Sequence, residues 1–207
     1  MKLSLRKNST QKAIHDKLCA WVVEQINTWH KEGKLNEKIY PKLWDGMVHQ
    51  LSKEMGMTPK DVVKGYLAIG ITKENFCDKS ILNQSLKGDA KAIHQDLLSL
   101  FERSRGQSNT KFLIGLGELE NAWSSKMDPS ALSEVMGVAE SSYIFWGDNI
   151  DDIEALSDPC RRQMGADILG DDAMGALGGS PGGFAGAVLG GVGCSLISTV
   201  ANAVGGC

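Results

Sequence analysis

Apolar residues recur at three- and four-residue intervals along most of the chain, the spacing of one buried face of an α-helix. The first stripe predicts a helix over residues 13–31, with Ser9 and Thr10 as candidate N-caps and Gly33 as the stop. Its apolar positions are Ile14, Leu18, Trp21, Val22, Ile26 and Trp29. The chain is therefore expected to begin with an amphipathic helix.

Similar stripes follow along the next hundred residues. One runs from Tyr40 to Met55 and stops at Gly56, and the next begins at Thr58-Pro59 with Val62, Val63, Tyr66, Leu67 and Ile69 on its buried side. Later stripes predict helices near residues 89–101, 113–123 and 128–136, and an aromatic-rich segment over 143–150. No alternating strand pattern or solenoid repeat is visible. Residues 1–157 are therefore expected to form an irregular multi-helix body of the all-α class.

The last 35 residues, 173–207, have a different composition. They contain no charged side chain and 11 of the 24 glycines. Seven of these glycines fall at four-residue intervals in two rows, Gly178, Gly182, Gly186, Gly190 and Gly175, Gly179, Gly183. On a helix each row forms a smooth face that lets another helix approach closely, as in membrane helix pairs. The sequence thus predicts a C-terminal glycine-rich apolar helix or helical hairpin, with Gly178, Gly182, Gly186 and Gly190 as its membrane or self-association face.

An acidic hinge, residues 158–172, is expected between the body and this tail, because Pro159 interrupts the preceding helix. The 21 uncharged residues 184–204 match the roughly 20 that span a bilayer, although glycines and polar residues dilute their hydrophobicity. Arg161 and Arg162 are the flanking basic pair, which would keep the amino-terminal side cytoplasmic.

Charge is uneven: residues 1–77 hold 13 Lys and Arg against 8 Asp and Glu, and residues 78–172 hold 9 against 17. The front-half lysines alternate with acids at helical spacing, which is typical of solvated helix faces, so no nucleic-acid partner is expected. The basic first ten residues lack a following apolar run, so we expect no signal peptide and a cytoplasmic body.

Motifs that carry chemistry are lacking. The four histidines, His15, His30, His49 and His94, form no HExxH motif and are expected at helix surfaces or core edges. The run from Gly147 to Glu154 is acidic but places isoleucines where an EF-hand needs ligands. The five cysteines contain no CxxC and are expected to be reduced thiols. We therefore expect a non-enzymatic protein with no catalytic residues, metal site or cofactor, and identify no small-molecule substrate.

The segment from Gly165 to Gly193 contains Ala166-Asp167-x-x-Gly170 followed by the spaced glycines. It resembles the endings of short bacteriocin-like proteins of the Bacteroidetes type, and the aromatic stretch 142–146 fits their layout. The resemblance covers about residues 141–207, and the long body before it departs from the short-peptide pattern. It implies a membrane-associating tail.

Two functions follow from these observations. The leading expectation is a helical protein whose tail binds a lipid membrane and self-associates through Gly182, Gly186 and Gly190. The alternative is a soluble helical adaptor whose glycine-rich tail is flexible or folds back onto the body.

Overall fold

The computed structural model is all-helical over the residues it describes, which are 10–68, 70–75, 86–179, 190–191, 199–200 and 202–204. The helices there are α1 (Thr10–Lys31), η1 (Glu37–Ile39), α2 (Tyr40–Met55), α3 (Pro59–Ala68), α5 (Gly88–Ser104), α6 (Asn109–Trp123), α7 (Pro129–Asn149), η2 (Ile150–Asp152) and α8 (Asp158–Gly179). The predicted all-α class is confirmed. Most of the predicted glycine-rich element beyond Gly179 lies outside the described residues.

Helix ends follow local signals in the sequence. The carboxylate of Asp128 accepts a hydrogen bond from the Ala131 N–H at 3.0 Å, and Pro129 occupies the first turn of α7, where its missing N–H costs nothing. Helix α2 ends at Gly56, whose φ of 63° is the left-handed conformation that glycine adopts without strain. Asp89 lies in the first turn of α5, where its negative charge suits the amino-terminal end of the helix.

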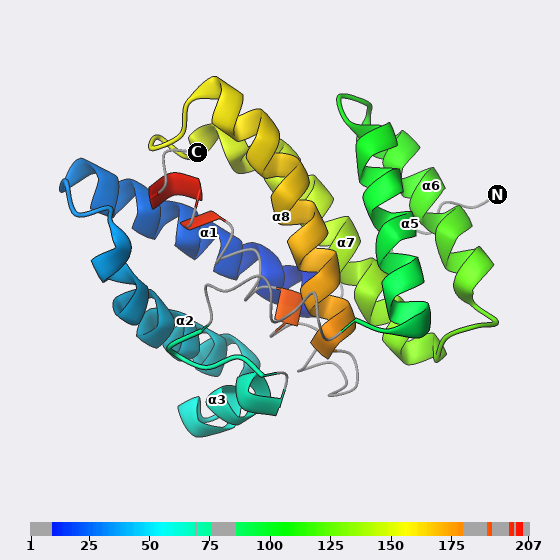
Figure 1. Ribbon diagram of the computed structural model, residues 1–207, viewed down its shortest axis with the longest axis horizontal. Coiled ribbons are helices and arrows are strands. Elements are labelled where there is room, and N and C mark those ends of the chain that lie inside the picture. The colour runs from blue at the N-terminus through cyan, green and yellow to red at the C-terminus, as the bar shows by residue number, and fades with distance from the viewer. Residues whose placement is uncertain are drawn as a thin grey trace.

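Helices α7 and α8 pack against each other at the centre of the bundle. Figure 1 shows α8 crossing between α1 on one side and α5 on the other, with α7 behind it. Helix α1 packs on α7 and carries α2, which in turn carries α3, while α5 and α6 pack together on the opposite side. The core therefore runs through the α7–α8 pair rather than through the amino-terminal helices.

Helix α7 is buried around most of its circumference. Its buried residues include every position from Glu134 to Tyr143, followed by Phe145 and Trp146. A helix enclosed on all sides needs mainly apolar residues all round. The buried polar residues of α7 are Glu134, Glu140, Ser141 and Ser142. The sequence predicted two separate segments here, because a helix with no polar face shows no amphipathic period.

Three other expectations change with the structure. Leu67 is 54% exposed rather than buried, because Val62 and Tyr66, four residues apart, share the inward face of α3. Residues 158–172, the expected hinge, are helical and continue into the first residues of the expected tail as α8. Cys160 is disulfide-bonded, so the expectation of reduced thiols throughout is wrong.

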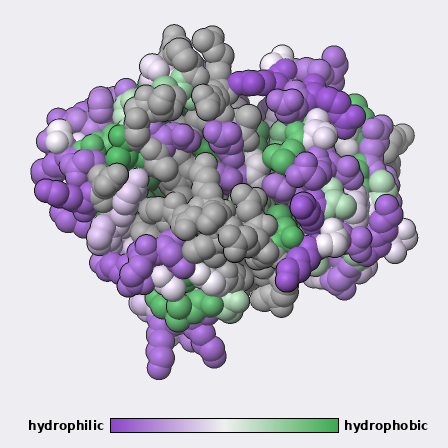
Figure 2. All heavy atoms as spheres, viewed as in Figure 1, coloured by the Kyte–Doolittle hydropathy of each residue, from purple (hydrophilic) through white to green (hydrophobic). Residues whose placement is uncertain are grey.

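The outer faces of the bundle are polar. Figure 2 shows a mainly hydrophilic surface over α1 and α2 on one side and over α5 and α6 on the other. Exposed ion pairs add to this polar surface: Lys17 of α1 pairs with Glu54 of α2 at 2.6 Å, and Lys73, in the turn after α3, pairs with Asp45 of α2 at 2.7 Å. Within the part of the chain that the structure describes, no helix is both long and apolar enough to cross a membrane.

Candidate functional site

A buried polar cluster lies where α1 meets α7 and α8. His15, on the inward face of α1, is completely buried and places its Nε2 3.4 Å from Oδ2 of Asp172 on α8. The hydroxyl of Ser142 on α7 donates a hydrogen bond to the same Asp172 oxygen. The three helices that form the core are therefore joined by three buried polar side chains.

The other side of the imidazole faces α7 and its own helix. Nδ1 of His15 lies 3.2 Å from Oγ of Ser141, and the Ser141 hydroxyl donates to Oδ1 of Asp16 at 2.6 Å. Cys19, one turn along α1, places its sulfur 3.7 Å from both ring nitrogens. Buried polar atoms cost free energy unless they are paired, and this arrangement gives each of them a partner.

Cys19 and two carboxylates together act on the protonation of His15. Burial alone would lower the pKa of its imidazole, but the Cys19 sulfur and the hydrogen bonds with Asp16 and Asp172 outweigh burial and hold that pKa well above its ordinary value. For Cys19, burial raises the pKa of the thiol despite the neighbouring imidazole. The cluster therefore favours the protonated form of His15, which lies between the carboxylates of Asp16 and Asp172.

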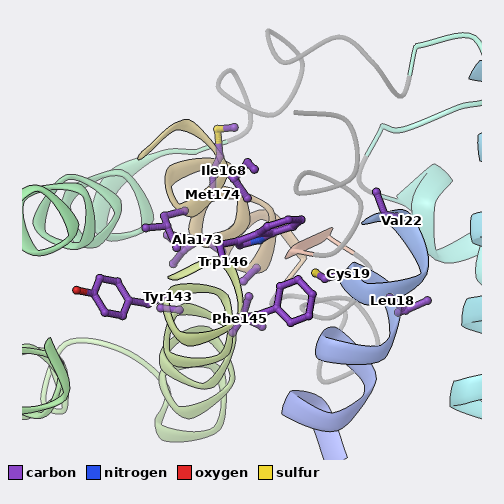
Figure 3. Packing of buried hydrophobic residues seen from close by; sticks show 14 of the residues in the cluster. Leu18, Cys19, Val22, Tyr143, Phe145, Trp146, Ile168, Ala173 and Met174 are labelled. Atoms are coloured by element: carbon purple, nitrogen blue, oxygen red, sulfur yellow. The ribbon is translucent and has the colours of Figure 1, made fainter. Parts of the chain in front are cut away.

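The cluster has the residue types of a cysteine nucleophile with a histidine base, but not their setting. Figure 3 shows Cys19 facing Phe145 in the apolar layer between α1 and α7. Cys19, His15 and Asp172 are all fully buried, and a reactive cysteine needs both exposure and a lowered pKa. The geometry therefore supports a structural role for these side chains.

Two tail glycines dock next to this cluster. A Cβ at Gly190 would lie 2.7 Å from the carbonyl carbon of Gly175 on α8, and closer still to its oxygen. A Cβ at Gly191 would lie 2.8 Å from Cγ1 of Val138 on α7 and 3.4 Å from the carbonyl oxygen of Asp172. Only glycine permits such close backbone approach, so residues 190–191 are seated tightly on the α7–α8 pair.

The glycines predicted as the association face and the two flanking arginines lie in different parts of the chain's structure. Gly190 contacts Gly175, a member of the second glycine row, within the same chain. Gly178 lies in α8, whereas Gly182 and Gly186 lie outside the described residues. Arg161 lies in the first turn of α8 and donates from Nη2 to the carbonyl of Ile153 at 3.3 Å, and Arg162 follows it in the same helix.

Sequence reasoning missed the polar cluster. His15 was expected at a surface or core edge, yet it is fully buried. One local signal was present, because His15 and Cys19 lie four residues apart on an otherwise apolar helix face.

Neither a protein family, nor a curated protein, nor a solved structure matches the chain. The site is therefore interpreted from its geometry.

Proposed function

We propose that this is a non-enzymatic helical protein whose glycine-rich segment, residues 173–207, associates with membranes and with other copies of itself. The observation that carries the proposal is the backbone contact of Gly190 with Gly175. Rows of small residues are used where two helices pack backbone to backbone, which is the contact that favours helix association in lipid. The resemblance of residues 141–207 to bacteriocin-like endings points to the same activity.

In this proposal the glycine contact also keeps the segment docked. Gly190 and Gly191 face α8 and α7 of their own chain, so these glycines are covered while the segment is docked. Membrane association through the same face requires residues 190–191 to leave α8. The docked and membrane-associated forms therefore compete, and a change that weakens docking should favour the membrane.

The test is flotation of the full-length protein with lipid vesicles. In Gly190→Ala the added methyl collides with the Gly175 backbone and disfavours docking, whereas alanine is still small enough for helix association in lipid. We expect the fraction that floats with vesicles to rise severalfold over that of the natural sequence.

Gly117→Ala is the matched control, because a Cβ at this helical glycine of α6 meets no atom within 4 Å. It should float like the natural protein. If Gly190→Ala remains in the protein-only fraction while circular dichroism shows an intact fold, the membrane proposal fails.

The alternative is a soluble helical adaptor whose tail stays folded back on the body. The docking of Gly190 on α8 favours this alternative as well, because it places part of the tail inside the bundle. Under this alternative Gly190→Ala lowers the free energy of unfolding without producing flotation. The two measurements on one variant therefore separate the two functions.

A further inference from the structure

A cavity of about 540 Å³ opens on the side of the bundle away from α1, between α5, α7 and α8. Its volume lies in the range of about 300–1,000 Å³ that small-molecule sites occupy. The apolar part of the wall comes from Leu98 and Phe101 of α5, Tyr143 and Trp146 of α7, and Leu169 of α8. The polar cluster around His15 does not contribute to it.

The aromatic rings of the wall are stacked, and they offer no free hydroxyl to a ligand. The ring of Tyr143 stacks on Phe112 with centroids 3.8 Å apart, and Phe101 lies parallel to Tyr143 at 6.4 Å. The Tyr143 hydroxyl donates to the carbonyl of Ser104 at 2.8 Å. This part of the cavity therefore suits a hydrocarbon chain.

The buried polar groups of the wall are hydrogen-bond donors. Trp146 is 1% exposed, and its Nε1–H finds no acceptor among the residues that the structure describes. Arg161 also lines the cavity: its side chain is 23% exposed, its Nη2 donates to the Ile153 carbonyl at 3.3 Å, and its Nη1 lies 3.8 Å from the exposed carboxylate of Asp151. The acids of the wall, Glu102 and Asp167, are exposed to water. The polar preference inside the cavity is thus for an acceptor that carries negative charge.

We propose that this cavity binds an amphipathic monocarboxylate, with its hydrocarbon chain along the aromatic wall and its carboxylate towards Arg161. Arg105 lies at the exposed rim together with Glu102 and Asp167, so the preference for a carboxylate rests on the inner donors rather than on the rim. A carboxylate accepts hydrogen bonds from guanidinium groups in a forked geometry, which a neutral or cationic head group cannot reproduce. This ligand site is independent of the membrane proposal and can be tested separately from it.

The first experiment titrates the full-length protein with dodecanoate below its micelle concentration, measured by calorimetry. Dodecanol and dodecyltrimethylammonium carry the same hydrocarbon chain with a neutral and a cationic head. We expect dodecanoate to bind about tenfold or more tightly than either comparison ligand. Equal binding of the cation, or no binding of dodecanoate, would overturn the proposal.

A second experiment places a side chain in the cavity. Gly147 lines it, and a Cβ at this position meets no atom within 4 Å, so Gly147→Leu extends into open space without disturbing the core. It should weaken dodecanoate binding about tenfold or more. Gly117→Leu, at an equally open helical glycine away from the cavity, is the matched control and should bind like the natural protein. Equal affinity of the two variants would place the ligand elsewhere.

A third comparison tests the head group. Arg161→Gln should weaken dodecanoate severalfold and leave dodecanol binding unchanged, because only the charged head loses its partner. Retained dodecanol binding also shows that the variant is folded. Arg105→Gln makes the same comparison at an exposed position. If neither variant distinguishes the two ligands, the assignment of the carboxylate is wrong.

Discussion

At the scale of single residues, the buried pair of His15 and Asp172 decides how α1 meets α8. Removing both charges from water costs several kcal/mol, which their mutual attraction and the hydrogen bond from Ser142 offset. Such a pair adds little net stability over an apolar one. Losing one partner is costly, however, because it leaves the other charge buried alone.

Folding raises the pKa of His15, so protonation of this imidazole stabilises the folded state. The stabilisation is complete at pH values below the unfolded pKa of about 6.5. That contribution is lost as the pH rises through the higher folded pKa. We expect the free energy of unfolding, measured by urea titration, to fall as the pH rises above about 6.5. Asp172→Asn should lower stability at pH 6 by about 3–5 kcal/mol and flatten this slope.

Asp148→Asn serves as the control, because Asp148 is exposed at the end of α7. It should retain both the stability and the pH slope of the natural protein. A slope that persists unchanged in Asp172→Asn would mean that another group produces it.

At the scale of elements, glycines mark the places where helices approach most closely. Gly46 of α2 is one of them, since a Cβ there would lie 2.8 Å from the Trp21 ring of α1. Gly117 of α6 is the opposite case, with open space where a Cβ would stand. The same residue type therefore serves packing in α2 and has no packing role in α6.

Alanine substitutions should separate these two roles by the sign of their effect. Gly117→Ala should stabilise the protein by about 0.5–1 kcal/mol, because alanine is the better helix former. Gly46→Ala gains the same propensity but must displace the Trp21 ring, at a cost of about 1–3 kcal/mol, so its net effect should be destabilising. Thermal unfolding of both variants measures the difference, and a stabilised Gly46→Ala would show that the α1–α2 contact yields easily.

The sequence pattern identifies the amphipathic helices, but it does not delimit a helix that is buried on most of its sides. The stripe through Trp44, Met47 and Leu51 identifies the buried face of α2, because each element of this kind carries its own signal. Helix α7 has no polar face to provide contrast, so periodicity could not delimit it. No local feature links His15 to Asp172, since the two are 157 positions apart. Pairings of that kind arise only from tertiary packing.

At the scale of the whole molecule, stability is expected to be greatest along α7, which packs against α1, α6 and α8. Hydrogen exchange measured by mass spectrometry should find the amides of residues 135–146 among the slowest of the described helices. Helix α3 packs mainly on α2 and exposes Leu67, so its amides should exchange sooner. Equal exchange in α3 and α7 would contradict a core centred on α7.

The long separation between His15 and Asp172 also has a consequence for synthesis on the ribosome. The first helix emerges 157 residues before its buried partner, which is roughly 8–30 s of translation at about 5–20 residues per second. For most of that interval the face of α1 that packs on α7 is uncovered, because α7 begins only at Pro129. We therefore expect this hydrophobic face of the nascent chain to be open to chaperones until α7 has been translated.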